Sequence, residues 1–325
     1  MSDAKCTTRR FLFMGTNMSE MHTARAGRNE DLSGIRRTPS NTIFALKFFA
    51  WGLMMGVGFW GSVTMPLPYI LPFQILLALG MVHGVELSHQ ALHGTAFSGR
   101  LANRIAGALM GLPMLVSFSA YRASHLHHHR ALGTPADREF WDYGDISRIS
   151  MRALAVHFLI LKHYQRAGAN IFRAVTFRND PDLPSRAARY AGTEYRAMAV
   201  MILALVAASI AIDPLIFLTG WLLPLVLIAG PVHALVELPE HHGCDRSTPD
   251  VFTNTRSITS NRFMTWFTNG NNLHVEHHYQ AGLPVESLRT LHERIGPRIV
   301  NRDQGYRAFY GRFFAEIFGR TARTA

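Results

Sequence analysis

Long apolar stretches alternate with charged stretches along this chain of 325 residues. Four of the apolar stretches are long enough to form helices that cross a bilayer, which takes about 20 residues each. They predict transmembrane helices at about residues 42–64, 69–88, 197–217 and 218–236. Residues 65–68 alone link the first two helices, and Asp213-Pro214 marks the turn region between the last two. The pattern therefore predicts two helical hairpins.

The remaining segments are expected to lie beside the membrane. Residues 1–41 are predicted to form a polar, basic N-terminal arm, and residues 42–325 a single domain. Residues 105–120 are apolar but short, and Gly111 and Pro113 interrupt them, which favours an interfacial or re-entrant helix. Aromatic residues recur at helical spacing over residues 306–318, either as an interfacial helix or as a helix packed on the rest of the chain. The predicted fold is an all-α integral membrane protein with a cytoplasmic helical cap.

The distribution of charge predicts the orientation. The formal net charge is +11, yet neither hairpin loop contains a lysine or an arginine. The positive-inside rule then places both termini and the segments 89–196 and 237–325 in the cytoplasm, with a bacterial-type inner membrane as the expected location. The two cysteines, Cys6 and Cys244, form no CxxC pattern, which fits a reducing, cytoplasm-facing environment.

Histidines are the main candidates for chemistry. The chain has 17 of them, roughly twice the ordinary usage. They gather in four clusters: HxxxH at residues 89–93, HxxHH at 125–129 and again at 274–278, and a pair at 241–242. Histidines four residues apart share one face of a helix and lie about 6 Å apart, close enough to bind one ion. Nitrogen-rich ligation without thiolates suits iron, zinc or copper, and more than six histidines exceed the needs of one ion.

All four clusters fall at predicted helix ends or in cytoplasmic segments, so the topology alone brings them to one side of the membrane. A lone histidine on an apolar helix is usually a packed core residue. Repeated close-spaced clusters are not explained in that way. A divalent-metal transporter is the alternative of another class, but it would carry its polar residues near the bilayer midplane.

The series HxxxH, HxxHH, HxxHH, with an additional Glu-His between the last two, resembles the membrane fatty acid desaturase family, which is related to the membrane alkane hydroxylases and carotene ketolases. The resemblance extends from about Thr42 to about Ile295 and includes His-Gly-Thr at 93–95 and Asn-Leu-His-Val-Glu-His-His at 272–278. It implies two iron ions, Fe2+ in the reduced state. Carried over by position, the implied ligands are His89, His93, His125, His128, His129, His241, His274, His277 and His278.

Other histidines are not expected to bind the metal. His127 is not required by the HxxHH spacing and should point away from its neighbours in a regular helix. His242 is ambiguous, because the family pattern uses the histidine directly after the glutamate. His83 is expected to be structural or to line a channel. The remaining histidines carry no predicted role; they are His22, His157, His163, His233 and His292.

Three polar residues are candidate catalytic groups: Glu86, Glu240 and Asn272. Glu86 lies one turn before His89, where a charge at membrane depth needs a purpose or a partner. Glu240, Glu276 and Asp137 either hydrogen-bond ligand imidazoles and fix their tautomers, or form surface ion pairs with the many arginines. Asn271 or Asn272 is expected to orient a bound water.

The resemblance implies an oxidoreductase that uses dioxygen and external electrons to desaturate an unactivated carbon–carbon bond. The expected substrate is a fatty acyl chain in a lipid or thioester; hydroxylation, or a small amino-acid-derived metabolite as substrate, remains the alternative. The chain has no haem motif or ferredoxin-type cysteine run, so a separate ferredoxin or cytochrome with its reductase is expected to supply electrons. The basic surface would attract an acidic donor or anionic membrane lipids. No nucleic-acid partner is expected.

Overall fold

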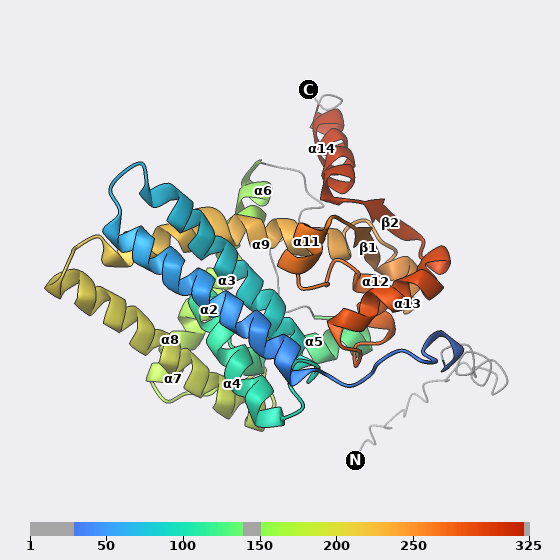
Figure 1. The fold of residues 1–325 in the computed structure, drawn as a ribbon, viewed down its shortest axis with the longest axis horizontal. Coiled ribbons are helices and arrows are strands. Elements are labelled where there is room, and N and C mark those ends of the chain that lie inside the picture. The colour runs from blue at the N-terminus through green and yellow to red at the C-terminus, as the bar shows by residue number, and fades with distance from the viewer. Residues whose placement is uncertain (1–28, 139–150, 322–325) are drawn as a thin grey trace, which may run out of the picture. The chain divides into compact units, whose positions relative to one another are not determined.

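The computed structural model describes residues 29–138 and 151–321 (Figure 1). The chain divides into two units, Met1–Ile35 and Arg36–Ala325. Most of the predicted N-terminal arm lies outside the described residues. Within the second unit, the described chain is mostly helical, as the apolar pattern predicted.

Four helical stretches of the described chain are long and apolar enough to cross a membrane. They are α2 (Asn41–Thr64), α3 (Ile70–Leu92), α8 (Ser185–Ala211) and the run Leu218–Glu240. The last run is made of η2 (Leu218–Leu222), η3 (Pro224–Ala229), α9 (Gly230–Glu237) and η4 (Leu238–Glu240). The four stretches match the four predicted spans, although α8 begins at residue 185 instead of 197.

Helix α3 is the central element of the four. Two thirds of its apolar window is buried (67 %), whereas only 17 % of that of α2 is. The two helices pack closely because α2 offers glycines to its neighbour: a Cβ on Gly58 would lie 2.7 Å from the backbone nitrogen of Leu77. The outer side chains of α2, such as Phe49 at 70 % exposure, are apolar, as expected for a surface that contacts lipid.

The segment after α3 turns back on itself. Helix α4 (Arg100–Gly111) and η1 (Leu112–Met114) are bent by 100° relative to α5 (Phe118–Ala131). The break contains Leu115 in a left-handed conformation (φ 59°), and the Ser117 side chain caps α5 by accepting from the backbone of Ala120. A bend of this size is compatible with the re-entrant helix predicted for residues 105–120 and equally with a broken membrane span. Helices α6 (Met151–Phe158) and α7 (Leu161–Val175) then lead to α8.

The C-terminal part contains short elements: α10 (Val251–Asn254), β1 (Arg256–Thr259), α11 (Arg262–Phe267), α12 (His274–Tyr279), η5 (Val285–Ser287), α13 (Leu288–Ile295), η6 (Gly296–Arg298), β2 (Asn301–Gln304) and α14 (Tyr306–Thr321). Strands β1 and β2 pair in parallel, with Arg256 opposite Asn301. The all-α prediction therefore missed a small sheet. Its strands have four residues each, too few for an alternating pattern to identify them.

Helix α14 packs on the rest of the chain. Phe309, Phe313 and Ile317 are buried in a cluster with Leu238 and Ile258. The structure thus favours the second alternative for residues 306–318, a helix packed on protein instead of one that lies free on the membrane.

Candidate metal centre

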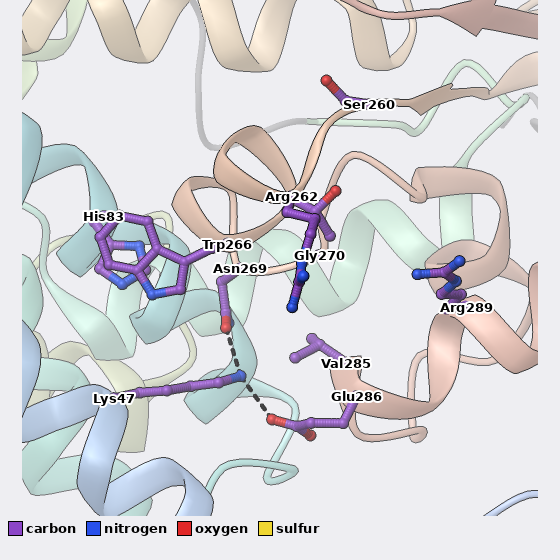
Figure 2. A pocket seen from close by; sticks show the side chains of 11 residues that line it. Lys47, His83, Ser260, Arg262, Trp266, Asn269, Gly270, Val285, Glu286 and Arg289 are labelled. Carbon is purple, nitrogen blue, oxygen red and sulfur yellow. Dashed lines mark hydrogen bonds and ion pairs between the residues drawn. The ribbon is translucent and has the colours of Figure 1, made fainter.

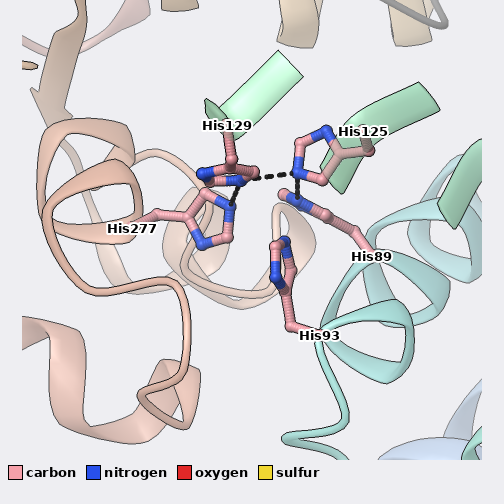
Figure 3. A group of neighbouring side chains, drawn as sticks. All are labelled: His89, His93, His125, His129 and His277. Atoms are coloured by element: carbon pink, nitrogen blue, oxygen red, sulfur yellow. Dashed lines mark hydrogen bonds between the residues drawn. The ribbon is translucent and has the colours of Figure 1, made fainter. Parts of the chain in front are cut away.

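The first group of histidines comes from three elements. Its members lie on α3 and at its end, on α5 and on α12, and one ring nitrogen of each lies within 4.8 Å of those of the others; they are His89, His93, His125, His129 and His277. Figure 3 shows the five rings facing a common centre. The four-residue spacing on α3 and on α5 produces this arrangement, because it points two rings of each helix the same way.

The ring nitrogens of this group lie close to one another. The Nε2 atom of His125 lies 2.7 Å from that of His89 and 2.9 Å from that of His129. The Nε2 atom of His129 lies 3.0 Å from that of His277. Such a set of converging imidazole nitrogens can surround a metal ion.

The second group is His128, His241 and His278, which again offer ring nitrogens within 4.8 Å of one another. His274 adjoins this group, with its Nε2 atom 3.1 Å from that of His278. All nine histidines that the family resemblance implied as ligands are therefore brought together, in two neighbouring groups.

Hydrogen bonds on the far side of two rings fix their tautomers. The Nδ1 atom of His128 lies 2.8 Å from a carboxylate oxygen of Asp137, and Nδ1 of His241 lies 3.0 Å from the carbonyl oxygen of Asn254. Both oxygens accept, so both Nδ1 atoms carry the proton. The two Nε2 lone pairs then face each other at 3.3 Å, which requires a positive centre between them, a proton or a metal ion. A proton would serve one pair only, whereas a metal ion would also engage His278.

The electrostatics favour neutral rings, the form that binds metal. The pKa of His241 is lowered to about 3, mainly by burial and to a smaller extent by the nearby His128. Six other histidines outside the membrane helices have a pKa well below the ordinary value, and burial is again the largest cause. They are His93, His125, His129, His274, His277 and His278.

Comparison with known proteins assigns the family. The family model described as "Fatty acid desaturase" matches residues 66–310, well over half of the chain and including all nine histidines. This chain belongs to the fatty acid desaturase family. No curated protein matches it. Membership indicates an oxidoreductase of the desaturase or hydroxylase type, and the four apolar helices together with the family indicate a membrane protein.

The desaturase family is known for two-iron sites, and the two histidine groups are suited to bind metal. The fit is supported further by buried ring nitrogens. The Nε2 atom of His93 and the Nδ1 atom of His274 are buried without a hydrogen-bond partner in the described part of the chain. A buried nitrogen without a hydrogen-bond partner destabilises the folded state unless a cation or a water molecule binds to it.

The predicted carboxylate contacts are partly present. Asp137 bonds His128, and an oxygen of Glu240 lies 3.1 Å from Nε2 of His274. Glu276 makes neither of the two predicted contacts, with a ligand imidazole or with an arginine: its carboxylate bonds the Nδ1 atom of His292 and accepts from the Ser257 hydroxyl at 2.5 Å. His292, to which no role had been given, thus supports α12 from α13.

Glu86 lies in a separate polar group beside the two histidine groups. Its Oε2 atom accepts a 2.6 Å hydrogen bond from the amide of Asn271, and a carboxylate oxygen of Glu86 lies within 4.8 Å of side-chain atoms of His233 and Glu237. His233 had been given no role in the sequence. Only the burial of these residues on neighbouring helices reveals the group, which no spacing in the chain indicates.

Asn272 has a different environment from Asn271. Its amide donates to the carbonyl oxygen of Ile258 at 2.7 Å and accepts from the Thr268 hydroxyl at 3.1 Å. The first contact joins β1 to the loop before α12, and the second lies within that loop. In the structure Asn272 contacts Ile258 and Thr268, whereas Asn271 is the amide that contacts Glu86.

The two ambiguous histidines lie outside both groups. His127 is on the outer side of α5, where its Nε2 atom bonds the carbonyl oxygen of Ala136 at 2.8 Å, as the helical geometry predicted. The His242 ring contacts Phe309 and Phe313 of α14. Its neighbour His241 is the one that reaches the second group.

Proposed function

We propose that this protein is an oxygen-dependent di-iron desaturase that acts on a fatty acyl chain in a lipid or thioester. The observation that carries the proposal is the pair of facing nitrogen lone pairs on His128 and His241, beside a separate group of five converging histidines. One group alone would suit a single ion. Two adjoining groups in a member of the desaturase family support a pair of irons.

The residues of the chain have distinct tasks in this proposal. The nine histidines hold the irons, which when bound supply the activation of dioxygen and the removal of hydrogen from an unactivated carbon. Asp137 orients the imidazole of His128 through its Nδ1 atom, and Glu240 contacts the Nε2 atom of His274 that also faces His278. The burial of the histidines excludes water, which protects a reactive oxidant from side reactions. Asn271 and Glu86 form a polar link at the edge of the site, where a proton can be held on the carboxylate.

The electrons come, in this proposal, from a separate ferredoxin or cytochrome that approaches the cytoplasmic side. The absence of lysine and arginine from both hairpin loops supports an inner-membrane protein with both termini and the site in the cytoplasm.

The test is to express the protein, measure the iron bound per chain after purification, and analyse lipids and small metabolites of the expressing cells by mass spectrometry. A desaturase gives a product that is two hydrogens lighter, dependent on oxygen. A product that is one oxygen heavier would make the protein a hydroxylase. A purified, folded protein without iron would refute the proposed centre.

A further inference from the structure

A cavity of about 320 Å³ opens beside the histidines, between α2, α3 and the segment of residues 260–289 (Figure 2). Its wall includes Lys47 and Glu286, the two arginines Arg262 and Arg289, and the neighbouring rings of His83 and Trp266. None of these side chains belongs to either histidine group.

Lys47 is fully engaged and forms one end of the cavity. Its ammonium group donates to Glu286 at 2.6 Å, to the side-chain oxygen of Asn269 at 2.8 Å and to that of Gln90 at 3.4 Å. An ammonium group has three protons, so these contacts use all of them. The same ion pair neutralises Glu286, the one carboxylate among the lining residues.

The two arginines therefore leave an excess of positive charge. The Arg262 side chain makes no hydrogen bond or ion pair with any residue that the structure describes, and Figure 2 shows it directed toward the Lys47–Glu286 pair. Arg289 has only a 4.0 Å contact with Glu293, in which both side chains are largely exposed (87 % and 67 %), and such pairs contribute little. A guanidinium group without a partner is well suited to bind a carboxylate or phosphate.

His83 adds a polar atom without a partner. Its Nδ1 atom donates to the carbonyl oxygen of Phe267 at 2.8 Å, and its ring lies 4.5 Å from that of Trp266. The residue is 1 % exposed, and its Nε2 atom has no hydrogen-bond partner within the described ranges. Because Nδ1 carries the proton, Nε2 is an acceptor, and buried polar atoms normally have a partner, so this nitrogen calls for a hydrogen-bond donor such as a water in the cavity.

Two features agree with a position of the cavity near the lipid headgroups. Lys47 is the seventh residue of α2, which corresponds to about 9 Å along the helix from its first residue. Trp266 and Phe263 are exposed on the same short helix, α11, and aromatic side chains are enriched where a membrane meets water.

We propose that this cavity binds the anionic headgroup, a carboxylate or a phosphate, of an amphipathic molecule. The inference rests on the proposed function in one respect: it takes the bound amphiphile to be the substrate of the desaturase, so the substrate class is an acidic amphiphile. The Asn269 amide connects the cavity to the histidines: it donates to Gln90 at 3.0 Å and to the carbonyl oxygen of Glu86 at 3.3 Å, on either side of His89. The Asn269 side chain, which lines the cavity, is therefore in direct contact with the turn of α3 that carries His89.

The experiment measures binding of radiolabelled palmitate and of 1-hexadecanol, its uncharged counterpart, to the purified full chain in detergent at pH 8. The double variant Arg262→Gln/Arg289→Gln should bind palmitate on the order of tenfold more weakly and hexadecanol equally well, because charged hydrogen bonds are lost and the apolar chain is unchanged. Arg307→Gln, which removes an exposed arginine on α14 outside the cavity, is the matched control and should change neither.

Competition distinguishes the two sources of an anionic headgroup. If phosphatidylglycerol displaces palmitate from the wild type and phosphatidylcholine does not, membrane lipids share the site; if neither does, the site takes single-chain acids. Equal affinity of wild type and double variant for palmitate would overturn the proposal, as would equal affinity of the wild type for acid and alcohol. Iron content and elution volume of each variant exclude misfolding. Binding is measured without turnover, so a missing product refutes the proposed function and leaves this result standing.

Discussion

Adjacent residues of α5 allow the metal centre to be tested with a matched pair of variants. His128 is 1 % exposed, faces His241 and is supported by Asp137. His127 points to the outer side of the helix, where it bonds one backbone carbonyl. We expect His128→Gln to lose metal from the second group and most of the turnover, and His127→Gln to retain both.

The expected magnitudes follow from the contacts. If each group holds one ion, the wild type binds about two irons per chain. Loss of a supporting carboxylate alone typically weakens metal binding by about 10-fold to 100-fold, and loss of the ring itself removes a donor as well, so iron should fall toward about one per chain in His128→Gln. His127→Gln removes a single exposed hydrogen bond, worth about 0.5–1.5 kcal/mol at most.

Iron per chain is measured by elemental analysis of protein purified in detergent, and turnover by oxygen consumption with a reduced electron donor. Size-exclusion profiles of both variants show whether the fold is kept. His93→Gln provides the complementary test, because it removes a donor from the first group only. If His127→Gln lost iron and His128→Gln kept it, the assignment of all three ligands on α5 would have to be redrawn.

Replacing Asp137 by asparagine keeps a contact with His128 but removes the charge, so iron affinity should fall by about 10-fold or more in chelator competition, and an unchanged affinity would contradict its role. The iron-free protein should lose thermal stability as pH falls from 6.5 toward about 3, because burial lowers the pKa of His241 to about 3 and the unfolded chain therefore binds the extra proton first. A melting temperature that stays constant over this range would exclude buried neutral rings. Reporter fusions at Ala325 and near Met65 should report opposite sides of the membrane, and the same side for both would refute the predicted topology.

The sequence, together with its family resemblance, was sufficient to predict which histidines converge. Spacings of three and four residues on a helix are local geometry, and they separate His128 from His127 without knowledge of the rest of the fold. The four apolar runs predicted the membrane helices for a similar reason, since length and hydropathy are properties of each segment. The start of α8 was predicted less well. The helix begins before the apolar part and includes Arg186 and Arg189, and a search for apolar segments leaves such charged residues out.

Contacts between distant segments could not be predicted. Glu276 bonds His292 because α13 packs beside α12, and Asn272 bonds Ile258 because β1 runs along the loop before α12. The sheet that fixes this register joins residues about 45 positions apart, with Thr259 opposite Gln304. Nothing in four-residue strands signals such a pairing, so the choice between Asn271 and Asn272 required the structure.

The polar residues of α3 explain how the membrane helix and the C-terminal segment specify each other. In an otherwise apolar helix, His83 bonds the backbone of Phe267, Glu86 bonds Asn271, and Gln90 bonds Asn269. A buried polar group left without a partner costs about 1–3 kcal/mol, and lipid offers no substitute for these partners. A shift of the C-terminal segment along α3 would break all three contacts together. The same contacts therefore hold the loop before α12 in the register that brings the last histidine cluster against His89 and His93.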